Sequence, residues 1–246
     1  GEVVFYRRSA QRQGTLPGGF GQSVVVQHER GLRTRYGNLQ RLTVKKFSGR
    51  AVGTDFILGH TGGSLEGALA AGDGTALAAE RAAPEGLFFQ LIDGELQRIV
   101  NPLHSLSSIS DTTSPRILGL YVRDGTEMRR IRDGGSLSQG EFEVIVETYD
   151  ISRTAGDAQR LAPYTVRLIV NGEKVAGLEF DAVEAEEQRH VLVSGGRRSA
   201  EEVYSGPWRL RIGSVPFRPT EMQLQVVVSD FSGNEVSEGY RVRVEE

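Results

Sequence analysis

Histidine is the side chain in this sequence that can serve most readily as a metal ligand or as a general base. It occurs four times, as His28, His60, His104 and His190. The spacings H-x-H and H-x-x-H let one element present two nitrogens to a metal, and none of the four histidines has such a partner. Cysteine is absent, which excludes thiolate metal sites and thiol catalysis. We therefore expect each histidine to lie on the surface or to be hydrogen-bonded locally.

Other patterns that could support catalysis or ligand binding are weaker still. The glycine-rich stretches 16–22 and 59–64 lack the lysine and the strand-to-helix setting of a phosphate-binding loop. No G-x-S-x-G motif occurs, although a Ser/His/Asp set assembled only in space stays open. Asp230 and Asn234, in S-D-F-S-G-N-E, offer two oxygens to calcium, which takes six to eight. We interpret this stretch as a turn held by Asx hydrogen bonds.

The elements that would position these residues are predicted to be strands. Residues 3–6, 23–28, 32–36 and 41–44 are short and rich in β-branched or alternating residues, and the stretch 86–103 is a strand, a D-G turn and a second strand. Residues 65–83 interrupt this pattern with alanine, leucine and glycine. We interpret them as an insertion with a short helix near 76–82. We expect Leu65, Leu69 and Leu77 of this insertion to pack near the remnant groove defined below.

Residues 105–115 are polar, end in proline and have the composition of a linker. After them, alternating strands are predicted at 116–123, 141–150, 164–173, 208–212, 222–230 and 240–244, a number and spacing typical of an antiparallel β-sandwich. Phe142, Val144 and Val146 should share one buried face of their strand, with glutamates on the other. The acidic runs 184–187 and 200–202 are predicted to be solvated loops.

The first hundred residues resemble the lysostaphin-type (LytM) peptidoglycan endopeptidases. Four pieces agree in order and spacing: G-E-V-V-F-Y at the start, G-G-F-G-Q-S-V-V-V-Q-H-E-R-G-L-R-T-R-Y-G-N-L, I-L-G-H-T-G-G, and the stretch 86–103 that ends in N-P-L. The resemblance implies a compact antiparallel β domain with a groove across one sheet.

The same resemblance implies that the catalytic chemistry has been lost. The family holds zinc with an early H-x-x-x-D pair and the second histidine of H-x-H, while the first histidine of H-x-H and that of Y-x-H-L act near the bound water. Y-x-H-L falls on Y-G-N-L here, so its histidine is replaced by Asn38, and H-x-H is replaced by Gly86 and Phe88. The early pair would precede Gly1. Asparagine does not carry a proton at neutral pH, and neither glycine nor phenylalanine offers a ligand atom.

A second resemblance covers the remainder of the chain. The stretch D-T-T-S-P-R-I (111–117) and the D-x-x-G-N turn at 230–234 are similar to the start and the end of many bacterial immunoglobulin-like domains. This resemblance implies a fold and no chemistry.

Length, composition and charge indicate how the chain divides into domains and which chemical class of partner it could bind. We predict an all-β protein of 246 residues, with a degenerate LytM-like domain at 1–106, a linker at 107–115 and an immunoglobulin-like β-sandwich at 116–246. Residues 1–106 carry a net charge of +3 and the rest −6. This charge is compatible with a weakly anionic partner such as a cell-wall glycan, but an ordinary solvated surface explains it more simply, and there is no basic stripe for nucleic acid. No apolar run approaches the ~20 residues needed to cross a bilayer, so we expect no membrane insertion by this segment.

These observations predict a non-catalytic protein of the cell envelope, periplasmic or extracellular, without a cofactor. It would bind peptidoglycan or a cell-wall-acting protein and regulate cell-wall remodelling. The remnant groove would be lined by Tyr36, Asn38, Gly86, Phe88 and Gln90. Two alternatives are a structural or adhesive surface protein with both domains as spacers, and an active zinc endopeptidase whose ligands come from elsewhere.

Overall fold

The structure is a computed structural model that describes residues 1–7, 21–43, 49–61, 87–106, 111–154, 157–186 and 189–246. Nearly all regular structure in these residues is β, which confirms the predicted fold class. The chain divides into two compact units, unit 1 (Gly1–Pro102) and unit 2 (Leu103–Glu246). The division falls near the predicted linker, and the independent folding of its two sides remains a prediction.

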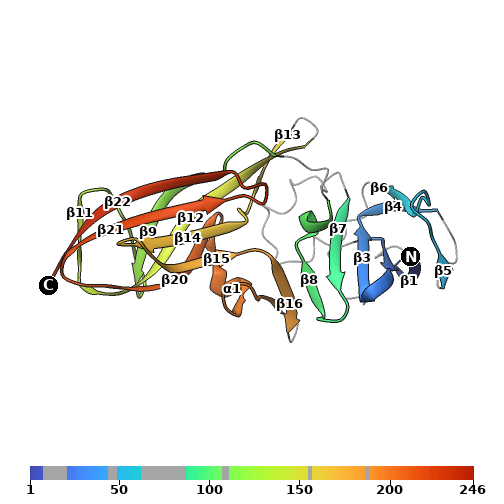
Figure 1. Ribbon diagram of the computed structural model, residues 1–246, viewed down its shortest axis with the longest axis horizontal. Helices are drawn as coiled ribbons and strands as arrows, with labels where there is room; N and C mark the ends of the chain where they lie inside the picture. Colours follow the sequence, from blue (N-terminus) through green and yellow to red (C-terminus); the bar gives the residue numbers. More distant parts are fainter. Residues whose placement is uncertain (8–20, 44–48, 62–86, 107–110, 155–156, 187–188) are drawn as a thin grey trace. The chain divides into compact units, whose positions relative to one another are not determined.

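Unit 1 is built on one antiparallel sheet, which holds the hairpin and the strands predicted from its sequence (Figure 1). In order across the sheet the strands are β5 (Arg50–Ala51), β1 (Glu2–Arg7), β2 (Ser23–Gln27), β3 (Leu32–Gly37), β7 (Phe88–Asp93) and β8 (Arg98–Val100).

Two further strands of unit 1 pair with each other, β4 (Leu39–Leu42) and β6 (Gly59–Thr61). The prediction for β4 was wrong by two residues, because the strand resumes directly after Asn38. That residue has a left-handed φ of 60°, which breaks the extended backbone after β3 and lets β4 leave the sheet. Strands β2 and β3 are joined by a single 3-10 turn, η1 (Glu29–Gly31), and a second such turn, η3 (Pro102–Ser105), lies where the two units meet in sequence.

Unit 2 is a β-sandwich (Figure 1). The first sheet has the order β10 (Glu127–Arg130), β9 (Arg116–Asp124), β12 (Gly140–Thr154), β20 (Arg209–Phe217), β19 (Tyr204–Gly206). The second has the order β11 (Gly135–Ser138), β22 (Glu235–Glu245), β21 (Glu221–Ser229), β14 (Thr165–Val170), β15 (Glu173–Glu179). All pairs are antiparallel except β11 with β22. The six predicted strands of this region correspond to β9, β12, β14, β20, β21 and β22.

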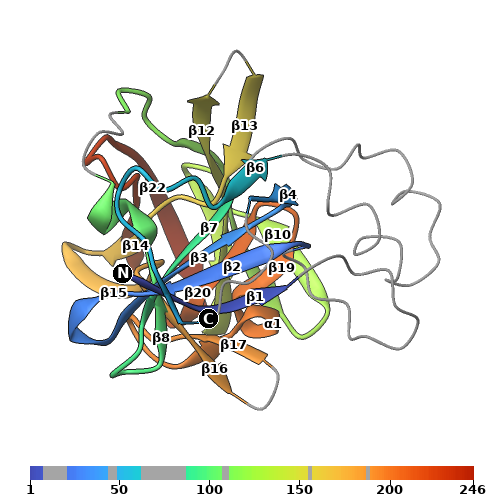
Figure 2. The ribbon, with the colours of Figure 1, turned by 90° about the vertical axis from the view of Figure 1, so that its right-hand side faces the viewer.

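The core of the sandwich lies between its sheets. Phe142, Val144 and Val146 are buried there as predicted, at 0 to 2% exposure, while the glutamates that alternate with them are partly or fully exposed. Strand β12 continues beyond the sandwich and pairs with β13 (Asp157–Leu161) in a hairpin that projects from it (Figure 2).

The two acidic runs are not loops. Glu184 and Glu186 lie in β16 (Ala182–Glu186), which pairs with β17 (Arg189–Leu192), and both accept hydrogen bonds from Arg197. Strand β17 pairs in turn with β18 (Arg198–Ser199). Ala200–Val203 form a one-turn helix, α1, because Ser199 and Glu202 cap each other's backbone N–H groups. Most residues of the two runs are exposed to solvent as predicted. They are not loops, because the ion pairs with Arg197 and the capping box hold them in a strand and a helical turn.

Candidate functional site

Unit 1 contains a cavity of about 600 Å³. We call it the unit 1 cavity, and it is lined by Gly1, Val26, His28, Tyr36, Leu39, Val52, Gly53, Thr54, Phe56, Leu58, Gly59, Thr61 and Leu87. A water molecule occupies about 30 Å³ in the liquid, so this space is far larger than a packing defect. It also falls in the range of roughly 300–1,000 Å³ that small-molecule sites occupy.

The walls of the cavity come from two different parts of unit 1. Val26 and Tyr36 face it from β2 and β3, and Phe56 and Leu58 from the segment before β6. Gly59 permits the close approach of β6 to β4, because a Cβ atom there would stand 2.6 Å from the carbonyl oxygen of Arg41. The apolar wall is thus fixed by the sheet on one side and by the β4–β6 pair on the other.

Apart from the N-terminal amine of Gly1, the polar groups that line the cavity are neutral at pH 7. His28 contacts the hydroxyl of Thr34, with Nε2 2.7 Å from Oγ1, and burial lowers the pKa of its imidazole below 6.5. Thr54 and Thr61 add exposed hydroxyl groups at the rim. Tyr36 is held by Phe89, opposite it on β7, with ring centroids 5.4 Å apart. The cavity therefore offers aromatic and aliphatic surface with hydroxyl and imidazole groups, and no ionised side chain.

Of the predicted groove residues, Tyr36 lines the cavity. Asn38 is fully buried, and Phe88 and Gln90 lie half-buried on β7; none of these three is among the lining residues. The register of β3 against β7 sets Gly37, the residue before Asn38, opposite Phe88. Gly86 and the insertion 65–83 fall outside the described residues.

Sequence analysis missed the apolar residues that supply most of the wall, such as Phe56, Leu58 and Leu87. Leu87 stands between Gly86 and Phe88 in the H-x-H comparison, and the alternation of a strand turns its side chain to the face of Tyr36 and Phe89. This alternation could have identified Leu87. It was missed because the H-x-H motif concerns only the two positions on either side of that residue.

The prediction for the four histidines is confirmed. His28 is hydrogen-bonded as described above, and His104 forms an ion pair with Asp181, Nε2 to Oδ1 2.5 Å. His60 and His190 are exposed on β6 and β17. Within the described parts of the chain, the one group of three side chains close enough to hold a metal ion consists of aspartates of unit 2 and includes no histidine.

The predicted Asx turn of unit 2 is also confirmed. The backbone N–H of Asn234 donates to Oδ1 of Asp230 at 2.8 Å, and its side-chain Nδ2 donates to Oδ2 of the same carboxylate at 2.7 Å.

Of three comparisons with known proteins, one found a match, and that match lies in unit 2. The model of one uncharacterised protein family matches residues 114–245, nearly the whole of the sandwich. No curated protein and no solved structure matches the chain. In the described residues, no helix has the length and apolar character needed to cross a membrane.

Proposed function

We propose that unit 1 binds a ligand in the cell envelope without catalysing a reaction. The chain belongs, through residues 114–245, to an uncharacterised protein family. This membership indicates no activity, so the proposal is argued from unit 1. The ligand would be peptidoglycan or a protein that acts on it, and binding would regulate cell-wall remodelling. The observation that carries this proposal is the unit 1 cavity, a large open space in a domain whose sequence pattern resembles a family that acts on peptidoglycan.

The composition of the cavity suits a ligand that is neither strongly charged nor purely apolar. Tyrosine and phenylalanine rings offer flat apolar surface on which a sugar ring or a peptide side chain can lie, while hydroxyl groups supply hydrogen bonds. Tyr36 and Phe56 provide such rings, and Thr54 and Thr61 such hydroxyl groups. The net charge of +3 on residues 1–106 favours a weakly anionic wall polymer over a cationic one.

The argument against catalysis rests on residue types. A zinc-bound water becomes a nucleophile near neutral pH when protein ligands hold the metal and a base accepts the proton. Asn38 and Phe88 occupy positions where the resemblance requires histidine, and neither can serve as a ligand or as a base in that role. The zinc endopeptidase therefore remains the weakest alternative.

A spacer role is the stronger competitor. Two β domains in series are sufficient for a structural or adhesive surface protein, and such a protein has no use for a cavity. The unit 1 cavity favours a binding role, and the matter is decided by whether this cavity governs attachment to the wall.

Co-sedimentation with purified peptidoglycan sacculi tests the proposal. Leu87 is 47% exposed and lines the cavity, whereas Leu96 is 59% exposed and lies in the β7–β8 turn, away from the lining. We expect the wild-type chain and Leu96→Asp to sediment with sacculi, and Leu87→Asp to lose most of the bound fraction, since a carboxylate would be placed in the apolar wall. Equal binding of the two variants would contradict the proposal. If the wild-type chain does not bind sacculi, the ligand would be a protein, and capture of cell-wall enzymes by wild type and by Leu87→Asp is compared next. Equal capture by the two would favour the spacer role.

A further inference from the structure

Unit 2 has a pocket on the outer face of its second sheet. The pocket has a volume of about 500 Å³, within the range of small-molecule sites, and lies over β14, β21 and β22. These strands lie side by side in Figure 1. Gln223 and Gln225 of β21 line the pocket and are exposed, whereas Leu224 between them is 2% exposed in the core. Because side chains alternate along a strand, both glutamines point away from the core. We call this space the unit 2 pocket.

Two turns flank the unit 2 pocket, and each is fixed to a strand by a pair of hydrogen bonds. On one side, Oδ1 of Asp133 accepts the backbone N–H of Arg241 at 2.7 Å, and the N–H of Gly134 donates to the carbonyl of Arg241 at 2.8 Å. On the other side, Asn171 in the β14–β15 turn donates its N–H to the carbonyl of Gln223, and its Oδ1 accepts the N–H of that residue, both at 2.8 Å. A site that is already fixed loses less conformational entropy when a ligand binds. The walls of the pocket are therefore preformed.

The pocket presents polar groups that the fold does not use. Among the described residues, the side-chain amides of Gln223 and Gln225 form no hydrogen bond. The register of β21 against β22 sets Gln223 opposite Arg241, whose Nε lies 3.8 Å from Oδ1 of Asp133, beyond hydrogen-bond length. An amide offers donors and an acceptor, and a guanidinium offers donors only. The charges of Asp133 and Arg241 cancel, so the pocket offers hydrogen bonds without net charge.

A glycine keeps the floor of the pocket open. The register sets Gln225 between Ile169 of β14 and Gly239 of β22. Packing does not require glycine at position 239, because the atom nearest to a Cβ built there, the carbonyl oxygen of Leu224, would be 4.0 Å away. The backbone does not require it either, since its φ is not positive. Glycine inside a strand weakens the strand and often marks a place where a ligand comes close to the backbone. Here it leaves free space beside the apolar side chain of Ile169.

We propose that the unit 2 pocket binds a neutral glycan chain of unsubstituted hexoses, such as a glucan. The amides of Gln223 and Gln225 and the guanidinium of Arg241 would form hydrogen bonds with sugar hydroxyl groups, each of which can donate and accept. The C–H face of one sugar ring would lie over Gly239 and against Ile169. This site is independent of the function proposed for unit 1, because peptidoglycan carries peptides with carboxylate groups and the chain proposed here carries none.

Other classes of ligand fit the unit 2 pocket less well. An anionic ligand would meet the carboxylate of Asp133 beside Arg241. A purely apolar ligand would cover the two glutamine amides without giving them hydrogen bonds, which is costly. An extended peptide that adds a strand needs the edge of a sheet. Strands β14, β21 and β22 are each paired on both sides, so their backbone is not available to such a peptide.

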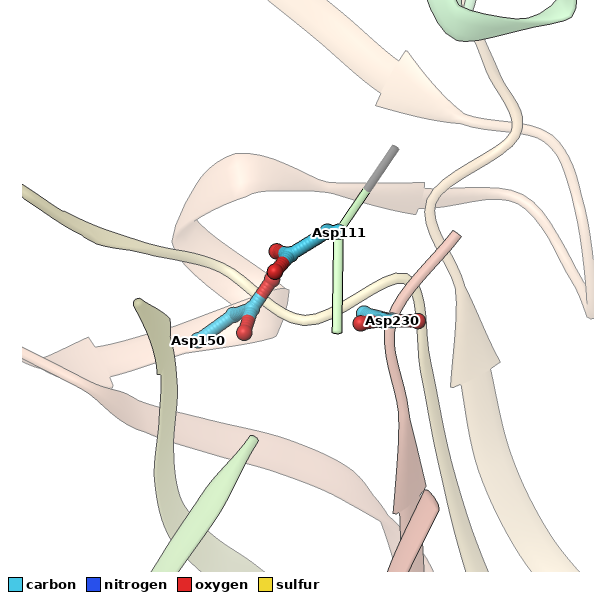
Figure 3. Close-up of side chains that lie close together, drawn as sticks. All are labelled: Asp111, Asp150 and Asp230. Atoms are coloured by element: carbon cyan, nitrogen blue, oxygen red, sulfur yellow. The ribbon is translucent and has the colours of Figure 1, made fainter. Parts of the chain in front are cut away.

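The pocket is distinct from a group of three aspartates elsewhere in unit 2, Asp111, Asp150 and Asp230 (Figure 3). Asp230 follows the end of β21, whereas the pocket lies near the start of that strand. Each of the three carboxylates accepts a hydrogen bond from a backbone N–H of its own segment. These local bonds account for the arrangement, and we assign no ligand to it.

NMR titration of the isotope-labelled full chain with cellohexaose and with maltohexaose, two soluble neutral chains of glucose, tests the proposal. Gly239→Phe places a ring in the pocket at a position where a Cβ has room. Its control is Ser237→Phe, the same ring at an exposed position on the same face of β22, outside the lining. A second variant combines Gln223→Ala and Gln225→Ala, and it carries the test if Gly239→Phe does not fold. Thermal unfolding shows whether each variant is folded.

We expect at least one of the two glucose chains to shift the backbone signals of residues 133–134, 169–172, 223–225 and 239–241 in wild type and in Ser237→Phe. Gly239→Phe should abolish these shifts, because its ring fills the space of the sugar. The double variant should bind about tenfold more weakly, as expected for the loss of two hydrogen bonds of ordinary strength. Hexagalacturonate, an acidic chain of the same length, should bind more weakly than the neutral chains.

The proposal is overturned if neither glucose chain binds, or if the shifts lie outside these segments. It is also overturned if the folded Gly239→Phe or the double variant binds as tightly as Ser237→Phe, or if the acidic chain binds as tightly as the neutral ones. Sacculi take no part in this experiment, so its failure is distinguishable from failure of the function proposed for unit 1.

Discussion

Units 1 and 2 are both β structures, but they fill their interiors differently. In unit 2 the buried side chains of two facing sheets form one continuous cluster. In unit 1, the buried cluster within the described residues is Val3, Val24, Val26 and Leu39, and the last two also line the cavity. Protein interiors are normally close-packed, so unfilled volume beside a small core is a feature that selection for stability alone would remove. This difference in packing supports the proposal that unit 1 binds a ligand and that unit 2 serves as the scaffold.

The largest effect should come from removing a core ring of unit 2. Phe142 is 2% exposed and makes an edge-on contact with Phe217, ring centroids 5.5 Å apart. Phe142→Ala should lower the free energy of unfolding of unit 2 by about 3–5 kcal/mol. The change is measured by urea unfolding followed by Trp208 fluorescence. A loss below about 1 kcal/mol would show that this core is not the tightly packed one described above.

The matched substitution in unit 1 is Val24→Ala, at a residue with no exposed surface. It removes about two methylene equivalents and should cost about 2 kcal/mol. Hydrogen exchange of peptides from residues 21–43 should accelerate while the Trp208 transition stays where it was. A shift of that transition would break the comparison, because the two units would then unfold together.

A smaller effect is expected in unit 1 when the pH is lowered below the ordinary pKa of histidine. Burial holds the pKa of His28 below its ordinary value of 6.5, so the unfolded chain binds more protons than the folded one between that lowered pKa and 6.5. The free energy of unfolding of unit 1 should therefore have its full value above about pH 6.5 and fall as the pH is lowered through that window. In His28→Gln this dependence on pH should be weaker. NMR titration of the imidazole, assigned by the same variant, checks the direction. A midpoint at or above 6.5 would contradict it.

The smallest effect is expected from separating the units. A fragment of residues 103–246 keeps the sandwich core and the turn formed by Asp230 and Asn234. Its Trp208 unfolding transition should agree with that of the full chain to within about 0.5 kcal/mol, because the buried cluster of the sandwich is made of residues of the fragment alone. Loss of cooperative unfolding in the fragment would show that unit 2 depends on unit 1.

The parts of the fold that were predictable are those where a local pattern and the tertiary environment agree. Alternation at Phe142, Val144 and Val146 identified the strand and its buried face, because period-two patterning is a property of the strand itself. The capping box of Ser199 and Glu202 was readable in S-A-E-E but was overlooked in favour of the charges. The charges of Glu184 and Glu186 spoke against a strand at β16. Arg197 forms hydrogen bonds with both carboxylates, and this pairing, across 13 and 11 residues, cannot be read from the local sequence.

The candidate sites show the same limit more sharply. Asp230 and Asn234 form a local turn, and five residues of sequence were enough to predict it. Asp111 and Asp150 join that turn only through the packing of two sheets, which no local pattern records. In unit 1, the resemblance pointed to Tyr36 but directed attention to positions that hold histidine in the LytM family, whereas the cavity lies among apolar residues that no motif distinguishes.

The central claim is that unit 1 binds cell-wall material without cleaving it, and one incubation measures both halves. Purified sacculi are mixed with the chain in the presence of zinc, the pellet is assayed for bound protein, and the soluble fraction is assayed for released muropeptides. We predict that the protein sediments with the sacculi and that no cross-link peptides are released above the level of a protein-free control. Release of cross-link peptides by protein that carries stoichiometric zinc would contradict this account.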